Sequence, residues 1–485
     1  MTRHPLSRRI ADVLALAPDS PAIEFDDTWW SWGEVDAAAR NIADLAVRHD
    51  STQTAVLLRN SPAHVATVLG LLLADATVVV VNPARGDDRT RADLAELAPA
   101  LAIGTPDDVA TLLAPSDRMT VATITTLAEA PAVSVFGRGT PDPRLGVAVR
   151  MLTSGTTGPP KRIDLTYDML ARGTLGDMPT APRRGVAIVN APLVHIGGVY
   201  RVLQCATAAR PFALLPRFEL DRWSDAVRRH RPGAVSLVPA ALRMVLQSGL
   251  TRDDLAGIRV VTSGTAPLSA DDADAFTEKF GIPVLTSYAA TEFGGGVAGW
   301  TLADHDRHWQ AKRGSVGRAT LGARLRVVTE QGDPVRPGEA GLLEVKPGQL
   351  GPGTEWIRTT DLARIDVDGF LWILGRADQA IIRGGFKVMP DDVRAALEAH
   401  AAVAGAAVVG RPDERLGETP VAMVELRAPV TADELVDHLR TRLAHYEVPA
   451  EIAVVDAIPR TPSGKPDLTA VRAHFADEVG SGRAG

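Results

Sequence analysis

The sequence predicts an α/β protein with a large N-terminal domain and a small C-terminal one, and three observations lead to this. The chain has 485 residues, more than one hydrophobic core usually serves. Helix-like and strand-like segments alternate along roughly its first two thirds, and short strands joined by turns take over after about residue 322. We therefore expect a large N-terminal domain of two parallel-type α/β sheets plus a small β subdomain, followed by a small mobile α+β C-terminal domain.

The alternation is clearest near the N-terminus. Pro62–Leu73 is predicted as a helix, and Thr77–Val81, which is rich in β-branched residues, as a buried strand. Further short β-rich runs occupy residues 186–190, 234–238 and 258–262. Segments with helical periodicity separate them, and strands that alternate with helices typically form parallel sheets.

The last third of the chain changes character twice. Short strands are predicted at residues 325–328, 341–345, 363–367 and 370–373, with Asp368-Gly369 as one of the turns. A βα pattern then resumes, with helices at 391–400 and 432–444 around a strand at 404–410. We place the domain boundary so that the N-terminal domain spans residues 1–376 and the C-terminal domain 377–485, and we expect the tail after about Phe475 to be loose.

Composition excludes several classes of protein. The net charge of −7 comes from well-mixed signs, which disfavours a nucleic-acid-coating surface. Cys205 is the single cysteine, so an intrachain disulfide and a cysteine-based zinc cluster are excluded, and we expect it to be a small buried apolar residue. The N-terminus lacks the apolar region of a signal peptide, and the most apolar run, 65–81, is too short to span a bilayer. We expect a cytoplasmic protein without membrane insertion, either a monomer or a homodimer.

One short segment concentrates the donors that bind phosphate. It contains Thr153, Ser154, Gly155, Thr156, Thr157, Gly158 and Lys161. Backbone N–H groups exposed by glycine, Ser/Thr hydroxyls and a lysine are suited to a triphosphate. The Gly-Lys-Ser/Thr ending of a Walker A loop is absent, which disfavours a P-loop NTPase. Taken alone, the segment could also be a flexible surface loop, which is the less favoured alternative.

This segment resembles the signature of the adenylate-forming superfamily, which includes acyl-CoA synthetases, aryl-CoA ligases, firefly luciferase and nonribosomal peptide synthetase adenylation domains. Six further motifs of that superfamily are matched in order, at residues 263–268, 287–292, 358–362, 375–378, 381–393 and 459–465. The resemblance covers nearly the whole chain. Besides the phosphate segment, it implies nucleotide contacts from Gly264, Thr265, Ala266, Pro267, Ser287, Tyr288, Ala289, Asp361 and Arg376.

The resemblance also implies individual roles. The Tyr288 ring would stack on adenine, the Thr291 hydroxyl would bind phosphate and Glu292 would hold Mg²⁺. Asp361 and Arg376 would bind the ribose. Asp378 would be the hinge, and Lys465 would be the lysine that catalyses adenylation.

Three residues depart from the superfamily pattern. Ala289 and Thr360 each replace a usual glycine, and Arg162 follows the signature lysine. None of these changes removes a functional group, although Ala289 could narrow the acyl pocket.

The segment Ala191–Gly198 resembles one in acyl- and aryl-CoA synthetases whose histidine lies beside the substrate carboxylate, so His195 is a catalytic candidate. A satisfied core histidine is the alternative. Amino-acid-activating relatives have an aspartate here, and its absence makes an α-amino acid substrate improbable. The expected pocket wall, residues 238–244 and 294–297, is mostly small or apolar, while Arg201 either reads a polar substituent or extends to the surface.

For the acceptor, the backbone around Gly385 could lie along a pantetheine arm, or it could be a plain glycine turn. No carrier-protein segment follows Lys465, so we expect a stand-alone ligase. The expected co-substrates and cofactors are ATP, Mg²⁺ and CoA.

The expected function is ATP-dependent activation of a hydrophobic or aromatic carboxylic acid as an acyl-adenylate, followed by transfer to CoA. Transfer to an amine, giving an amide, is the nearest alternative. A non-catalytic nucleotide-binding relative and a P-loop NTPase, which would release ADP, are less favoured.

Overall fold

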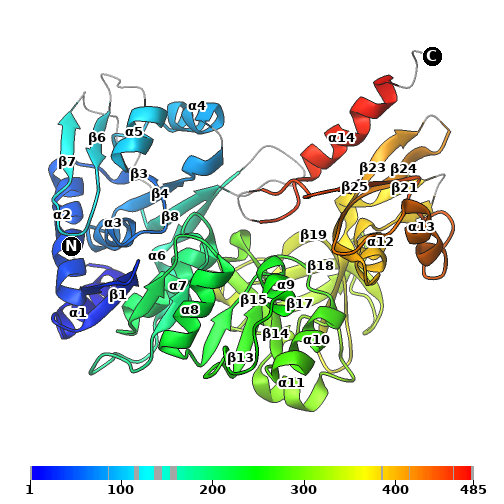
Figure 1. Ribbon diagram of the computed structural model, residues 1–485. Helices are drawn as coiled ribbons and strands as arrows, with labels where there is room; N and C mark the ends of the chain where they lie inside the picture. The colour runs from blue at the N-terminus through cyan, green and yellow to red at the C-terminus, as the bar shows by residue number, and fades with distance from the viewer. Residues whose placement is uncertain are drawn as a thin grey trace.

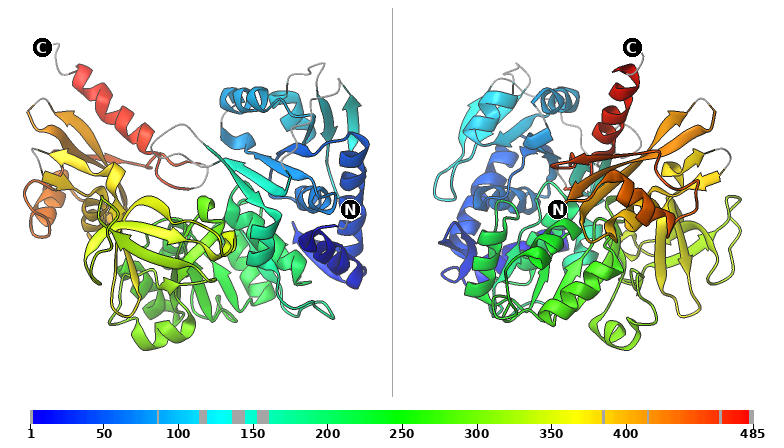
Figure 2. Two further views of the ribbon diagram at one scale, coloured as in Figure 1. Left: turned by 180° about the vertical axis from the view of Figure 1, so that it is seen from behind. Right: turned by 45° about the vertical axis from the view of Figure 1, so that its right-hand side comes forward.

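The computed structural model describes residues 3–85, 87–113, 119–135, 145–152, 161–383, 386–413, 415–461 and 464–481. A large N-terminal body is followed by a smaller C-terminal region, drawn in orange to red, which lies beside the body in both Figure 1 and Figure 2. The chain enters that region through the short 3₁₀ helix η4 (Ala377–Gln379). The sequence predicts the domain boundary between residues 376 and 377, and it stays a prediction.

The largest sheet has seven strands in the order β7-β6-β5-β3-β4-β8-β9. Its central strands are parallel, and β7 and β9 are antiparallel edge strands. The strands are β3 (Gln53–Leu57), β4 (Thr77–Val81), β5 (Leu101–Gly104), β6 (Thr120–Thr123), β7 (Ala132–Val135), β8 (Val147–Leu152) and β9 (Arg162–Thr166).

Two further sheets complete the α/β part of the body. The first has the order β12-β13-β14-β15-β16, parallel through β14 and antiparallel beyond it. Its strands are β12 (Ala234–Ser236), β13 (Val260–Ser263), β14 (Val284–Ala290), β15 (Gly295–Gly299) and β16 (Arg318–Ala319). The second has the order β10-β11-β1-β2, from β10 (Ala187–Val189), β11 (Phe212–Leu214), β1 (Pro21–Phe25) and β2 (Thr28–Ser31). The predicted α/β class is confirmed, but this small sheet makes a third where two were expected, because β1 pairs with a strand far along the chain.

The predicted β subdomain is an antiparallel sheet of β17 (Arg324–Val328), β18 (Ala340–Lys346), β19 (Ile357–Ile365) and β20 (Leu371–Arg376). The C-terminal sheet has the order β22-β21-β24-β23, with β25 also paired to β24. Its strands are β21 (Ile381–Arg383), β22 (Phe386–Val388), β23 (Val403–Asp413), β24 (Gly417–Leu426) and β25 (Glu451–Val455).

Helices cover these sheets. They are α1 (Pro5–Leu16), α2 (Trp32–Arg48), α3 (Pro62–Leu73), α4 (Asp87–Leu97), α5 (Pro106–Leu112), α6 (Tyr167–Thr174), α7 (Ile196–Thr207), α8 (Leu220–His230), α9 (Pro239–Gln247), α10 (Ala270–Phe280), α11 (Leu302–His308), α12 (Pro390–Glu398), α13 (Ala432–Arg440) and α14 (Leu468–Ser481), with short 3₁₀ helices η1 (Pro83–Arg85), η2 (Thr291–Phe293) and η3 (Gly348–Leu350).

The predictions for α3 and β4 match the observed bounds, and two others were wrong. The strand predicted at 363–367 is the end of the longer β19, and the chain turns where Gly369 N–H donates to the Asp366 carbonyl. The tail expected to be loose after Phe475 continues as α14 to Ser481. Val471 and Phe475 of this helix are buried against β23 and β24, which holds it in place.

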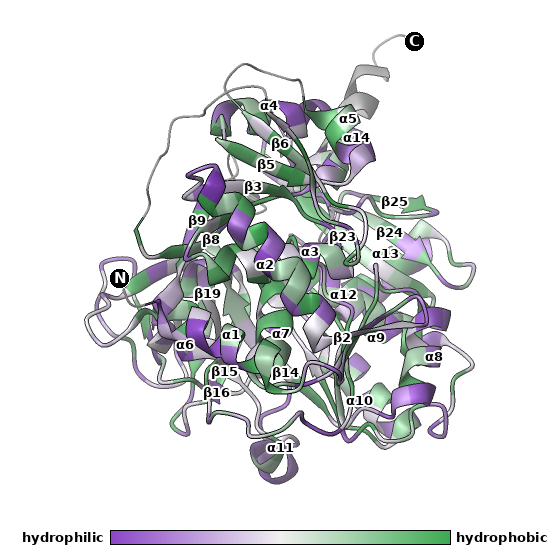
Figure 3. Cartoon of the chain, turned by 90° about the vertical axis from the view of Figure 1, so that its left-hand side faces the viewer, coloured by the Kyte–Doolittle hydropathy of each residue, from purple (hydrophilic) through white to green (hydrophobic). Residues whose placement is uncertain are grey.

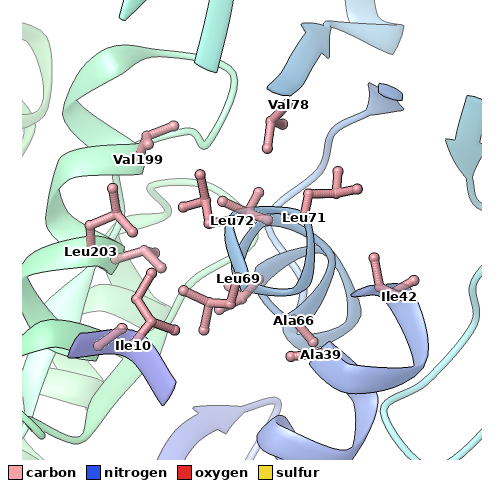
Figure 4. Packing of buried hydrophobic residues seen from close by; sticks show 14 of the residues in the cluster. Ile10, Ala39, Ile42, Ala66, Leu69, Leu71, Leu72, Val78, Val199 and Leu203 are labelled. Carbon is pink, nitrogen blue, oxygen red and sulfur yellow. The ribbon is translucent and has the colours of Figure 1, made fainter. Parts of the chain in front are cut away.

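Helix α3 is the centre of the main core. All twelve of its residues are buried, between α1, α2, α7 and the seven-stranded sheet (Figure 4). A Cβ at Gly70 would lie 2.3 Å from the Ala39 carbonyl oxygen, so only glycine allows α2 to approach this closely. A helix that is apolar on every side is expected in such a position.

The outer elements are polar by comparison. Helix α11 buries none of its residues and is coloured hydrophilic over most of its length in Figure 3. Cys205 of α7 is 2% exposed, as the sequence predicted, and burial raises its pKa to about 11. Among the described residues, no helix is long and apolar enough to cross a membrane.

Candidate active site

The carboxyl end of β14 carries the central motif of the site. Ser287 and Tyr288 are half-buried, and Ala289 after them is exposed. The chain then turns through η2, in which Thr291 is half-buried and Glu292 is exposed. Gly294 ends this turn with a φ of +69°, a conformation that favours glycine. The turn presents the Thr291 hydroxyl and the Glu292 carboxylate at the end of the sheet, where open α/β sheets bind ligands.

The loop after β13 lies against this strand. A Cβ at Gly264 would be 2.8 Å from Ser287 Oγ, which in turn donates to the Ser263 carbonyl at 3.5 Å. Thr265 has a φ of +71°, which is strained for a β-branched residue. Ala266 is half-buried and Pro267 exposed. The structure thus places the motifs at residues 263–268 and 287–292 against each other, which the sequence indicated only through the family resemblance.

Tyr288, Asp361 and Arg376 meet across three strands. The Tyr288 hydroxyl donates to Asp361 Oδ2, and Asp361 and Arg376 are register partners of β19 and β20. Burial raises the pKa of Asp361, a shift that the Tyr288 hydroxyl and the Arg376 charge oppose. Burial likewise raises the pKa of Tyr288, and the Asp361 charge adds to that shift.

Arg376 is oriented by residues on both sides of it. Its Nη2 donates to Thr360 Oγ1 at 2.7 Å, and its Nε and Nη2 donate to the Asp378 carboxylate at 2.9 and 2.7 Å. Thr360, one of the departures from the superfamily pattern, therefore supplies an additional acceptor. The hinge candidate Asp378 lies in η4 and is bonded to the body through this arginine.

Lys465, near the far end of the chain, interacts with this cluster through its charge. It is half-buried, and burial lowers its pKa, helped by the Arg376 charge and opposed by Glu292 and Asp361. Its backbone belongs to a closed turn in which Thr461 N–H donates to the Lys465 carbonyl at 2.7 Å and Asp467 N–H to the Pro459 carbonyl at 2.8 Å. In Figures 1 and 2, the segment before α14 lies between the C-terminal sheet and the body.

The glycine-rich segment is described only at its end. Thr153, Ser154, Gly155, Thr156, Thr157 and Gly158 lie outside the described residues, and so does Gly385. Lys161 is exposed. The following Arg162 has a structural role, because its Nη2 donates to both carboxylate oxygens of Asp93, at 2.7 and 2.6 Å. This buried ion pair fixes the start of β9.

His195 is the residue before α7, in a segment that is held by Asn60. The Asn60 side chain accepts from Leu193 N–H at 2.7 Å and donates to the carbonyls of Ala191 and Leu215 at 3.1 and 3.0 Å. Asn60 is 8% exposed and lies 133 residues from Leu193, so no local pattern could identify it. A Cβ at Gly198 would be 2.2 Å from the Pro192 carbonyl oxygen, which explains the glycine in the motif.

Glycines and one tyrosine lie beside the Thr291 turn. Gly295 and Gly296 pair with Ala290 and Ala289 across β14 and β15, and a Cβ at Gly296 would meet no atom within 4 Å. A Cβ at Gly295 would lie 3.7 Å from the Tyr200 ring, and burial raises the pKa of Tyr200 to about 12. These glycines add no side-chain bulk beside the Thr291 turn, and the acyl wall itself stays a prediction.

Two other predicted wall residues differ from the glycine region. Val238 and Met244 are 37% and 48% exposed, so they are less enclosed than expected. Arg201 donates to the exposed Gln204 at 3.4 Å, which favours its surface interpretation.

Known proteins resemble this chain over most of its length. The sequence profile of the AMP-binding enzyme family matches residues 10–353, and that of the AMP-binding enzyme C-terminal domain matches residues 392–465. The chain is 29% identical to the indoleacetate–CoA ligase of Aromatoleum aromaticum over 95% of this chain and 96% of that one. It is 29% identical to 4-coumarate–CoA ligase 5 of Oryza sativa subsp. japonica, covering 90% of this chain and 87% of the relative.

Solved structures show the same fold. The ATP-bound MatB from Rhodopseudomonas palustris superposes with a TM-score of 0.81 at 26% identity, covering 97% of this chain and 99% of that one. The o-succinylbenzoate CoA synthetase of Bacillus subtilis gives a TM-score of 0.78 at 24% identity, covering 98% of both chains.

Proposed function

Because the chain belongs to the AMP-binding enzyme family, we propose that it activates a hydrophobic or aromatic carboxylic acid as an acyl-adenylate and then transfers the acyl group to CoA. The main support is the geometry of Tyr288, Asp361 and Arg376, which meet at the end of β14. The charge of Lys465, from the C-terminal region, interacts with Asp361, Glu292 and Arg376 of the body. A site assembled from two regions suits a reaction in two steps.

In the first half-reaction, the substrate carboxylate attacks the α-phosphorus of ATP and expels pyrophosphate. Charge builds up on the phosphate oxygens, so catalysis depends on positioning and on nearby positive charge. Lys465 supplies that charge, and Thr291 donates a hydrogen bond. His195 lies beside the acid carboxylate.

Nucleotide binding is assigned to the body. Asp361 accepts from the ribose hydroxyls, Arg376 donates to the ribose and the Tyr288 ring stacks on adenine. The segment from Thr153 to Lys161 binds the β- and γ-phosphates. The hydrogen bonds of Tyr288 to Asp361 and of Arg376 to Thr360 support these assignments, because they hold the side chains before the nucleotide arrives.

Glu292 fits a magnesium ion that is bound together with ATP. It is an exposed carboxylate whose charge interacts with that of Lys465, and Mg²⁺ usually takes one or two protein carboxylates plus substrate phosphates. When bound, the ion would neutralise phosphate charge.

In the second half-reaction, the C-terminal domain, residues 377–485, turns about Asp378 and moves Lys465 away from the adenylate. The CoA thiol then replaces AMP on the acyl carbon. The two CoA ligases named above support CoA as acceptor and an aromatic acid as substrate. The glycines at 294–296 support an acid pocket with little polar lining.

A panel of acids tests this proposal. AMP formation is measured with and without CoA for indoleacetate, 4-coumarate, 2-succinylbenzoate, anthranilate and medium-chain fatty acids, and products are identified by mass spectrometry. We expect at least one acid to give an acyl-CoA thioester with AMP and pyrophosphate, and the Lys465→Ala protein to give little.

Other outcomes contradict the proposal in distinct ways. Product formation that requires an amine instead of CoA indicates an amide ligase. ADP release indicates a phosphate-transferring NTPase, and failure of pyrophosphate exchange with every acid removes the activation step itself.

A further inference from the structure

An ion pair that does not involve Lys465 joins the body to the C-terminal region. Arg243 of α9 donates through Nη2 to Glu398 Oε2, at the end of α12, at 3.2 Å. The two side chains are only 15% and 10% exposed. The residues are 155 positions apart, on opposite sides of the hinge candidate Asp378.

Each partner is also held within its own region. Arg243 Nε donates to Asp272 Oδ2 of α10 at 2.7 Å. Arg394 Nη1 of α12 donates to the same Glu398 Oε2 at 2.9 Å, so two guanidinium groups share this oxygen. If the two regions separate, Arg243 keeps Asp272 and Glu398 keeps Arg394.

That arrangement makes the contact reversible. Breaking a buried ion pair is strongly unfavourable when it leaves a charge without a partner. Here separation leaves neither charge alone, so the cost is limited to one shared hydrogen bond. The contact can stabilise one arrangement of the two regions without preventing the other.

The start of α12 also lies against the strand that leads into the hinge. A Cβ at Gly375, whose φ is +127°, would be 2.8 Å from Met389 Cε and 3.4 Å from Asp391 Oδ2. Any rotation about Asp378 therefore moves α12 relative to β20 and α9. Such a rotation changes the distance between Arg243 on α9 and Glu398 on α12.

We propose that Arg243 and Glu398 form an interdomain clasp that favours the arrangement in which Lys465 faces Asp361 and Glu292. The inference rests on the proposed function, because a clasp matters to catalysis only if the C-terminal region must turn between two half-reactions. The clasp positions Lys465 for adenylation and opens before acyl transfer. Arg243 is thus a positioning residue that acts through Lys465.

The kinetic test separates the two half-reactions. Adenylation is followed by pyrophosphate exchange with the best acid of the panel, and transfer by the reaction of CoA with the preformed adenylate of that acid. We expect Arg243→Ala to lower kcat/KM for adenylation about fivefold, the scale of one shared hydrogen bond, and to leave transfer unchanged or faster. Arg243→Lys should restore most of the adenylation rate.

A matched control comes from the C-terminal region itself. Arg411 of β23 pairs with Glu451 of β25, and its side chain is 22% exposed, so Arg411→Ala removes a comparable ion pair inside one region. We expect this protein to keep the parental ratio of the two half-reaction rates. In a double-mutant cycle, Glu398→Gln should add little to Arg243→Ala.

A conformational measurement tests the clasp independently of turnover. Glu278 of α10 and Asp433 of α13 are both exposed, while Cys205 is buried, so Glu278→Cys and Asp433→Cys allow specific dye labelling. Energy transfer between the dyes should show a larger population of separated regions for Arg243→Ala than for the parent or for Arg411→Ala. An unchanged distribution overturns the clasp whatever the rates are. If no acid reacts with CoA, the proposed function fails while this measurement still decides on the clasp.

Discussion

The body and the C-terminal region contribute to the candidate active site in different ways. In the body, Tyr288, Asp361 and Arg376 are bonded to each other or to neighbouring strands before any ligand is present. Among the described residues, the backbone of Lys465 is held by hydrogen bonds of its own turn, and its side chain interacts with the body through charge. A binding surface gains from being pre-formed, whereas a group that serves one of two steps gains from being removable.

The largest expected effect comes from removing the side chain of Lys465. Lys465→Ala should lower the rate of adenylation by about 10²- to 10³-fold, the usual effect of losing one donor to a developing oxyanion. Transfer from the preformed adenylate should survive, because that step is proposed to occur with Lys465 withdrawn. Pyrophosphate exchange and single-turnover thioester formation measure the two steps, and equal losses in both would refute the assignment.

Lys161 and Lys465 allow a comparison of two lysines from different parts of the chain. Lys161 is exposed, whereas Lys465 is half-buried, so the interaction of Lys161 with phosphate is weakened more by solvent. Lys161→Ala should lower adenylation about tenfold, chiefly through a higher KM for ATP. Exchange rates measured across ATP concentrations check this, and a larger loss than for Lys465→Ala would reverse the proposed ranking.

Tyr288→Phe tests whether the hydrogen bond between Tyr288 and Asp361 prepares the nucleotide site in the body. The substitution keeps the ring but removes the hydroxyl that donates to Asp361, so KM for ATP should rise about fivefold. That hydrogen bond lowers the pKa of Asp361, which burial already holds above its ordinary value. Without it the pKa rises further, and adenylation should be lost at a higher pH as the solution is acidified.

The control for this prediction is a residue that lies outside the pair. Arg228→Ala removes exposed ion pairs to Asp225 and Asp254 on α8 and the segment before β13, and it should leave the acidic limb of the pH profile unchanged. If Tyr288→Phe also leaves that limb unchanged, Asp361 is not the group that titrates.

The local features of the fold were predictable, but several tertiary ones were not. Helix α3 and strand β4 follow from runs of apolar and β-branched residues, because buried elements need such side chains along their whole length. The pairing of β1 with β11, the contacts of Asn60 and the clasp of Arg243 and Glu398 join distant segments. Short-range periodicity carries no information on such pairs.

In the candidate active site, too, some features were predictable from the sequence and others were not. The order of the motifs was sufficient to nominate Tyr288, Asp361, Arg376 and Lys465, which the structure brings together. It gave no reason to expect that Thr360 accepts a hydrogen bond from Arg376, since the superfamily pattern has a glycine there. Departures from a motif are interpretable only when the neighbouring side chains are known.

The smallest expected effect concerns the pH dependence of the native protein. Burial and the Arg376 charge lower the pKa of Lys465 below the ordinary 10.5, so its positive charge is lost at a lower pH than that of an exposed lysine. Adenylation depends on that charge, and its kcat/KM, which reports groups of the free enzyme, should fall as the pH rises through this pKa. Transfer from the preformed adenylate should show no such decrease, because ionisation of the CoA thiol favours it at high pH.

Lys465→Arg is the matched control, since a guanidinium stays charged throughout, and its adenylation should lack the alkaline decrease even if it is slower at neutral pH. An alkaline decrease that persists in Lys465→Arg belongs to another group. It would contradict the proposal that the C-terminal region supplies the charge of Lys465 for adenylation only.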